Sequence, residues 1–202
     1  MATLKGIAII GWGSLIWDLE SLAPQTKGDW EMGVGPELAM EFARVSPKRK
    51  LALAVCLEPM HGAPCRTNVI ASTRTNIHDA VADLAVRERA PVERVGAICA
   101  RSGHVSGSNR EITGAVSDWC ARTGWDGAVW TDLEPNFEEH LGDAFSVQRA
   151  ITYLKGLRSE SREEAVRYIE LAPAATDTPL RRALGAEEWW LEDARRLGLR
   201  SG

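Results

Sequence analysis

The spacing of the apolar residues changes along the chain. Up to about residue 100 they gather in short runs that stop at glycine, proline or polar turn residues, which is typical of buried β-strands. Beyond about residue 110 they recur mostly at the three- and four-residue spacing of amphipathic helices. The expected strands cover residues 7–10, 38–45, 51–57, 68–73, 92–100 and 127–132. We expect the second and third strands to pair as a hairpin around a turn at Pro47–Lys50.

One helix interrupts the strands, and the other helices follow them. The expected helices cover residues 77–88, 108–124, 147–157 and 161–172, with a last helical segment at 178–199. Asn76 is a suitable N-cap for the first helix. The patterns Ser108-x-x-Glu111 and Ser161-x-x-Glu164 are capping-box signatures, and each predicts a helix start.

This order of elements predicts an α+β fold, in which a mixed sheet or small β-barrel has helices packed against it. We expect one domain of residues 1–202, with a core at 1–109 and a mainly helical extension at 110–202. The extension should pack on the core, because each of its helices has one narrow apolar face and no core of its own. Residues 19–36 are rich in glycine and proline and predict a long loop. Such a loop is placed to cover the turn that precedes it.

That turn follows the first strand and contains two glycines. Its residues are Gly11, Trp12, Gly13, Ser14 and Leu15. The glycines permit a positive φ and a close backbone approach, so successive N–H groups can converge on an anion, with a serine hydroxyl beside them. An ordinary strand-to-loop turn explains the same spacing. The turn is no dinucleotide fingerprint, since Ile16 stands where the third glycine would be, and it lacks the G-x-S-x-G pattern of a hydrolase nucleophile.

A glutamate lies on the apolar face of the helix expected at 77–88. The other members of that face are Ile77, Val81, Leu84 and Ala85. Glu88 therefore occupies a position where a core residue is expected, at the C-terminus of the helix. Burial and the negative end of the helix dipole both favour its neutral form, whereas the flanking Arg87 and Arg89 oppose them. The alternative is a frayed last turn with Glu88 in solvent, paired with an arginine.

Composition and charge exclude several classes of partner. The 202 residues are 45% hydrophobic and 26% charged, and the formal net charge is −4, so we expect no nucleic acid or anionic membrane as a partner. No apolar run has the length of a membrane span. The N-terminal residues lead into the first strand without a signal-peptide pattern, which predicts a cytoplasmic protein.

The four cysteines and four histidines are scattered along the sequence. The cysteines are Cys56, Cys65, Cys99 and Cys120. With no C-x-x-C or H-E-x-x-H pattern, the sequence predicts free, mostly buried thiols, no metal site and no cofactor.

The glycine turn resembles the YGSL loop of the γ-glutamyl cyclotransferase-like family, most closely the form found in its ChaC-type branch. The resemblance extends over about residues 6–100. It includes a strand at 69–73 followed by a helix that ends in a glutamate, here Glu88, at a separation from Ser14 in keeping with the family. One position departs from the pattern, since Trp12 stands where the family usually has tyrosine.

The resemblance implies an enzyme that cyclises a γ-glutamyl amide or peptide to 5-oxoproline and releases an amine. Glu88 would be the general acid and base, and the Gly11–Leu15 turn would bind the substrate without a metal or cofactor. A non-catalytic small-molecule-binding or interaction protein on the same fold is the main alternative, and Trp12 favours it. An amide-cleaving or acyl-transfer enzyme acting on another γ-glutamylated compound is a third. The leaving group and the oligomeric state do not follow from the sequence.

Overall fold

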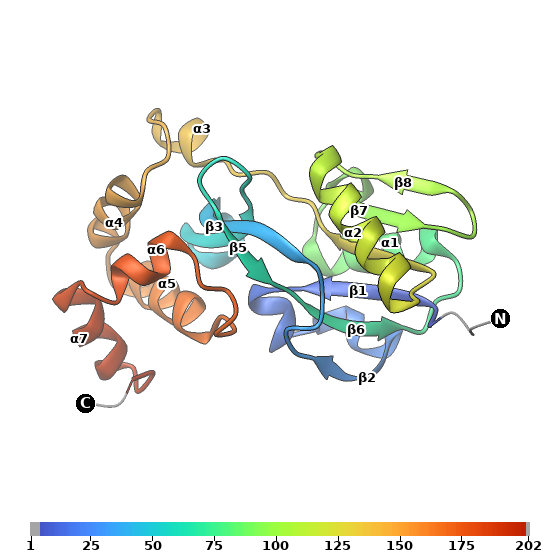
Figure 1. Cartoon of the computed structure of the whole chain (residues 1–202). Coiled ribbons are helices and arrows are strands. Elements are labelled where there is room, and N and C mark those ends of the chain that lie inside the picture. Colours follow the sequence, from blue (N-terminus) through green and yellow to red (C-terminus); the bar gives the residue numbers. More distant parts are fainter. Residues whose placement is uncertain (1–4, 201–202) are drawn as a thin grey trace. The chain divides into compact units, whose positions relative to one another are not determined.

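The computed structural model describes residues 5–200. Two compact units form within the chain (Figure 1). Unit 1 takes in the chain up to Leu38 and Arg66–Leu133, and unit 2 comprises Ala39–Cys65 and the chain from Glu134 onward. The expected α+β class is confirmed, with a mixed six-stranded sheet, a three-stranded sheet and helices.

Unit 1 is built on the six-stranded sheet, whose strand order is β2-β6-β1-β9-β7-β8. The strands are β1 (Ile7–Gly11), β2 (Thr26–Glu31), β6 (Asn68–Ser72), β7 (Val95–Cys99), β8 (His104–Ser106) and β9 (Gly127–Thr131). β1 and β9 are parallel and the other neighbours are antiparallel. Ile9 lies opposite Ile70 on one side and Val129 on the other, so three buried β-branched residues cross the centre of the sheet.

The position of β9 changes the expected division of the chain. We expected a core at 1–109, yet β9 pairs with both β1 and β7 inside the sheet. A core that ended at residue 109 would leave those two strands without their shared neighbour. The helix α2 (Arg110–Thr123) also belongs to unit 1, so the boundary after the sheet falls at Leu133.

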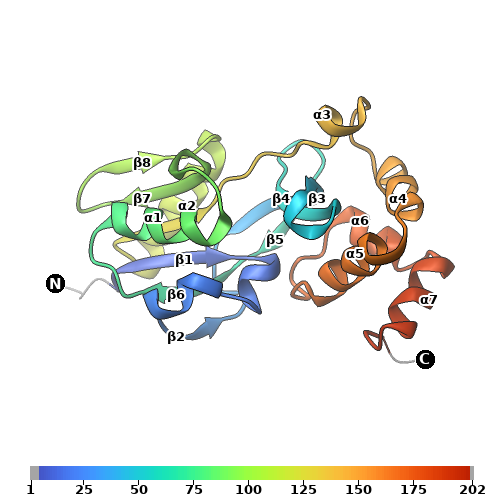
Figure 2. The same cartoon turned by 180° about the vertical axis from the view of Figure 1, so that it is seen from behind.

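Two helices cover opposite faces of this sheet. α1 (Ile77–Glu88) packs on the face formed by Ile7, Ile9 and Val129, and its Leu84 is fully buried there. α2 packs on the opposite face, and the two helices exchange front and back between Figures 1 and 2. The bounds of α1 match the prediction, and the Asn76 side chain accepts a hydrogen bond from the N–H of His78 at 2.9 Å, as an N-cap does.

The predicted capping box at Ser108 is wrong by one residue. The N-cap of α2 is Asn109, whose side-chain oxygen accepts from the N–H groups of Glu111 and Ile112. Ser108 instead donates through its backbone N–H and its hydroxyl to the buried carboxylate of Asp132. The side chain of Ser108 is therefore used to fasten the entry to α2 to the end of β9.

The segment 19–36 is more regular than predicted. It contains the short 3-10 helix η2 (Glu20–Gln25) and the edge strand β2, which pairs with β6. The indole of Trp30, on β2, lies so close to Gly11 that a Cβ atom there would come within 2.5 Å of the ring. The segment thus covers the glycine turn, as expected, but as a strand and not as a loop.

Unit 2 contains the three-stranded sheet, in the order β4-β3-β5. Its strands are β3 (Glu37–Ser46), β4 (Ala52–Leu57) and β5 (Ala63–Arg66). β3 and β4 form the expected antiparallel hairpin, joined by the 3-10 turn η3 (Pro47–Arg49). Phe42 on β3 and Leu53 on β4 are fully buried.

Five helices complete unit 2. They are α3 (Phe137–Leu141), α4 (Val147–Gly156), α5 (Ser159–Leu171), α6 (Pro179–Leu184) and α7 (Glu188–Arg196). α5 packs on β4 through an apolar face that includes Val166 and Ile169. The capping box predicted at Ser161 is wrong, because α5 begins two residues earlier and its N-cap residue, Arg158, makes no side-chain cap. Thr178 and Pro179 do start α6, with the Thr178 hydroxyl oxygen accepting from the N–H of Arg181.

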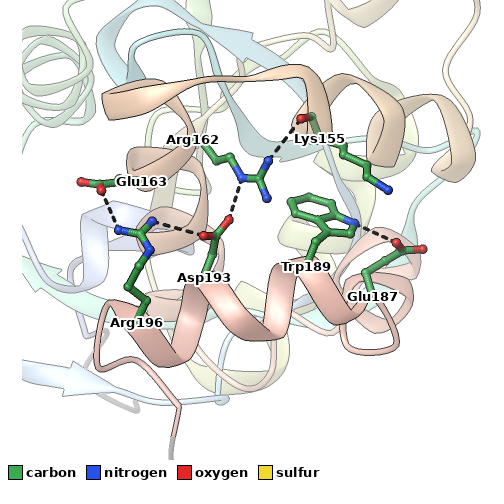
Figure 3. Close-up of polar contacts among 7 residues, drawn as sticks. All are labelled: Lys155, Arg162, Glu163, Glu187, Trp189, Asp193 and Arg196. Atoms are coloured by element: carbon green, nitrogen blue, oxygen red, sulfur yellow. Dashed lines mark hydrogen bonds and ion pairs between the residues drawn. The ribbon is translucent and has the colours of Figure 1, made fainter.

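A network of charged side chains joins α5 to α7 (Figure 3). Arg162 donates to Asp193 at 2.6 Å, and Arg196 bridges Asp193 and Glu163 at 3.2 and 2.9 Å. The guanidinium of Arg162 also lies over the Trp189 ring, 4.6 Å from its centre. These contacts connect α5 to α7. Each exposed ion pair among them adds little to stability by itself.

All four cysteines are free and buried, as the sequence predicts. No helix within residues 5–200 combines the length and the apolar character needed to cross a membrane.

Candidate functional site

The turn after β1 is a short 3-10 helix. Trp12 is extended at its N-cap position, and the helix η1 (Gly13–Ile16) follows, with Gly13 at a φ of +59°. The N–H groups of Trp17 and Asp18 both donate to the carbonyl of Ser14, at 3.2 and 2.9 Å. Ser14 and its two helical neighbours are buried. The turn is therefore held tightly beneath the surface of unit 1.

Two side chains outside the turn fix its first residue. Asn68, buried on β6, donates through its amide to the carbonyl of Gly11 at 3.2 Å and accepts from the N–H of Gly33 at 2.9 Å. Trp30 packs on Gly11 where any larger residue would collide with its ring. Glycine is therefore required at position 11 by this close approach, and not by its φ angle.

The C-terminus of α1 lies against this turn through a buried arginine. The Arg87 side chain is only 2% exposed, and its guanidinium bonds residues of both segments. It donates to the Glu88 carboxylate at 2.7 Å, to the Ser14 hydroxyl at 3.3 Å and to the Asp18 carbonyl at 2.6 Å. One guanidinium thus connects the acid at the end of the helix to Ser14 within the turn and to Asp18 just after it. Because its planar fork fixes the direction of each bond, the three partners cannot move independently.

Glu88 is largely buried but does not occupy a core position. Its side chain is 13% exposed, and its Oε1 atom accepts the bond from Arg87. α1 ends here because Arg89 adopts a left-handed conformation, with a φ of +54°. Arg89 itself is 69% exposed and reaches Glu20 at 3.5 Å. The last turn of α1 is ordered, unlike the frayed alternative.

The role of Arg87 is not evident from the sequence pattern. On the helical wheel this residue lies at the edge of the apolar face, and the expected core residue of the last turn was Glu88. The structure buries Arg87 and leaves Glu88 partly exposed. The reason is electrostatic: the C-terminus of a helix is negative, which favours the cation and leaves an unpaired carboxylate unstable.

Asn68 and Trp30 were also missed. Neither has a recognisable signal in the sequence, because Asn68 begins an ordinary strand and Trp30 lies in the segment expected to be a loop. Of the predicted turn residues, Ser14 and Leu15 lie beside α1: Ser14 bonds Arg87, and Leu15 shares a core with Leu84, whereas Gly11 lies against Trp30 and Asn68. Trp12 is buried, with 7% of its surface exposed.

The chemistry available here is that of one carboxylate with a fixed orientation. Arg87 engages one oxygen of Glu88 and leaves the group oriented relative to the Ser14 hydroxyl. A carboxylate so held can accept a proton and return it to a second atom nearby. Within residues 5–200, histidines, cysteines and acidic residues nowhere form a group of three suited to a metal ion.

Comparison of this chain with protein-family models, with curated proteins and with solved structures finds no match.

Proposed function

We propose that the protein is a γ-glutamyl cyclotransferase-like enzyme, which converts a γ-glutamyl amide or peptide to 5-oxoproline and releases an amine. The observation that supports this most is the contact of Arg87 with both Glu88 and Ser14. It joins the two segments whose sequences resemble that family, although they are far apart in the chain.

The reaction needs a proton acceptor and a proton donor but no protein nucleophile. Glu88 takes a proton from the substrate α-ammonium, and the free amine attacks the γ-carbonyl carbon to form a tetrahedral intermediate. The bond from that carbon to the leaving nitrogen then breaks while Glu88 returns its proton to that nitrogen, and the ring nitrogen releases its remaining extra proton to water as the lactam forms. One carboxyl group therefore performs both transfers, and no metal or cofactor enters the reaction.

The other residues of the turn would bind the substrate. Backbone N–H groups between Gly11 and Leu15 are the donors assigned to the substrate α-carboxylate or to the oxyanion that develops on the γ-carbonyl oxygen. Since Arg87 already bonds Oε1 of Glu88, we assign Oε2 to the proton transfers. The same proposal includes a cyclotransferase-like sheet or small barrel as the fold, and a cytoplasmic location.

Binding without turnover is the second candidate, and Trp12 is the observation that favours it. Its indole stands where the family usually has tyrosine and is buried in the turn, so the hydroxyl that a tyrosine would offer is absent there. A protein of this kind would bind γ-glutamyl compounds at the turn and release no product.

A panel of γ-glutamyl dipeptides, γ-glutamyl amines and glutathione, assayed for 5-oxoproline and for binding, separates the candidates. The proposal expects 5-oxoproline from at least one compound, in proportion to the enzyme present. Saturable binding of panel members with no product would favour the binding protein. If no compound of the panel yields product and none binds, both candidates are overturned.

A further inference from the structure

A pocket lies in unit 1, at the other end of the sheet from Glu88. It is about 280 Å³ in volume and is bounded by the end of β7, the start of β8, the last turns of α2 and the residues that lead into β9. The strand register separates it from the candidate active site. Cys99 and Ile7 both lie opposite Gly127 at the pocket end, whereas the turn after β1 follows Ile10, which lies opposite Trp130.

The wall of this pocket is mainly apolar. Its principal apolar members are Ile98, Cys99, Val105, Cys120 and Trp125. Burial raises the pKa of the Cys120 thiol to about 12, so the thiol is neutral and unreactive at physiological pH. The lining therefore suits binding of an apolar group.

One acidic side chain on the lining is buried and incompletely paired. The Asp126 side chain is 2% exposed, and its Oδ2 atom forms an ion pair with the Arg101 guanidinium at 2.8 Å. Its Oδ1 atom is buried and has no hydrogen-bond partner among residues 5–200. The backbone of Asp126 is fixed at both ends, since its N–H donates to Gly6 and its carbonyl accepts from Ala100. These bonds fix the backbone position of Asp126 beside the pocket.

The cation paired with Asp126, Arg101, is a weak partner. The Arg101 side chain is 64% exposed, so water screens its charge and competes for its donors. A cation inside the pocket would act in less polar surroundings, where charge-assisted hydrogen bonds are strong. It would meet a carboxylate whose charge is only partly compensated.

We propose that this pocket binds a small organic amine in its ammonium form, with the ammonium at Asp126 and an apolar body against Ile98, Val105 and Trp125. The volume lies near the lower end for small-molecule sites, which fits one ring with a short amine-bearing chain. This inference does not depend on the proposed cyclotransferase reaction, because the pocket shares no residue with Glu88, Arg87 or the glycine turn.

The test uses phenethylamine as the probe, with 2-phenylethanol and 3-phenylpropanoate as its neutral and anionic counterparts. Binding to the full chain is measured by calorimetry, and the site is located from the shifts of the Ile98, Val105 and Trp125 resonances. We expect saturable binding of the amine, at least about tenfold tighter than that of the other two compounds.

Two substitutions at the carboxylate should act in opposite directions. Asp126→Asn should weaken amine binding by about tenfold, because the ammonium loses a charged acceptor. Arg101→Gln should tighten it by about two- to fivefold, since it removes the competing internal cation. Ala121→Phe, at the exposed part of the lining, should block all three compounds. Glu111→Gln removes one negative charge elsewhere on α2 and should change nothing.

Equal binding of the three compounds, no saturable binding at millimolar concentration, or an amine affinity unaffected by Arg101→Gln would overturn the proposal. If Asp126→Asn fails to fold, Arg101→Gln and Ala121→Phe decide the question, since a gain in affinity cannot come from unfolding.

Discussion

Two carboxylates, Glu88 in unit 1 and Glu41 in unit 2, lie at opposite kinds of helix end, a C-terminus and an N-terminus, and are stabilised in different ways. Glu41 is fully buried at the N-terminus of α6, where it accepts hydrogen bonds from the N–H groups of Leu180 and of its neighbour Phe42. Glu88 lies at the C-terminus of α1, where the free backbone groups are carbonyls, which cannot donate a hydrogen bond, and where the helix dipole is negative. Its stabilising contact is the Arg87 guanidinium.

The difference separates a structural acid from a candidate functional one. Glu41 joins β3 to α6 and is fully buried, so its hydrogen bonds serve to hold these two elements together. Glu88 keeps part of its surface exposed and is connected, through Arg87, to the turn that follows β1. An acid in an unfavourable position, held there by a buried cation, is the arrangement expected where orientation matters more than stability.

The largest effect should come from removing the part of unit 1 that lies beyond residue 109. A chain ending at Asn109 lacks β9, so β1 and β7 lose their shared partner and the sheet beneath α1 is open. We expect an insoluble or unfolded product. The measurement is thermal unfolding followed by circular dichroism, with the full chain as control. A cooperative transition in the 1–109 fragment would show that the site around Glu88 needs neither β9 nor unit 2.

Removing the cation at Glu88 should have the next largest effect. Arg87→Met keeps the apolar stem but leaves Glu88 without its partner at a helix C-terminus, which should lower the free energy of unfolding by about 3 kcal/mol. Arg89→Met is the matched control: its ion pair with Glu20 is exposed, so the loss should stay below about 1 kcal/mol. Urea unfolding measures both. Equal losses would mean that burial of Arg87 has no special consequence.

A smaller, pH-dependent effect is expected at Glu41. Burial raises the pKa of this carboxyl above its ordinary value of 4.5, against the opposing effect of its hydrogen bonds. The folded state therefore binds the proton more tightly than the unfolded state, and stability is lost as pH rises from 4.5 through the raised pKa.

Glu41→Gln should remove that loss. The difference in unfolding free energy between the variant and the wild type should shift in favour of the variant as pH increases over this range, and become constant above it. Urea unfolding at a series of pH values measures the difference. A difference independent of pH would contradict the raised pKa of Glu41.

The sequence predicted local structure well where two local signals agreed. The helix at 77–88 combined a cap at Asn76 with a clear apolar face, and its bounds were correct. The strand β2 was missed because its apolar content is low and its glycine suggested a loop; pairing with β6 holds it as a strand. The two capping boxes failed because serine has other possible partners, as Ser108 has in Asp132.

The candidate site was predictable only in part, for a similar reason. Each of the two segments, the glycine turn and the last turn of α1, could be proposed from its own local sequence pattern. The contact between them depends on Arg87, whose burial follows from tertiary packing against Ser14 and Asp18. A helical wheel places side chains around an axis but does not show what lies opposite them.

The most direct measurement is turnover by Glu88→Gln, using a γ-glutamyl substrate found in the panel. The amide retains size and an oxygen for Arg87 but cannot accept the proton of the substrate ammonium, so release of 5-oxoproline should fall by about 10²–10⁴-fold. Substrate affinity and melting temperature should stay close to wild type, since the turn and the core are unchanged. Near-wild-type release of 5-oxoproline by the folded variant would contradict the assignment of Glu88 as the acid and base.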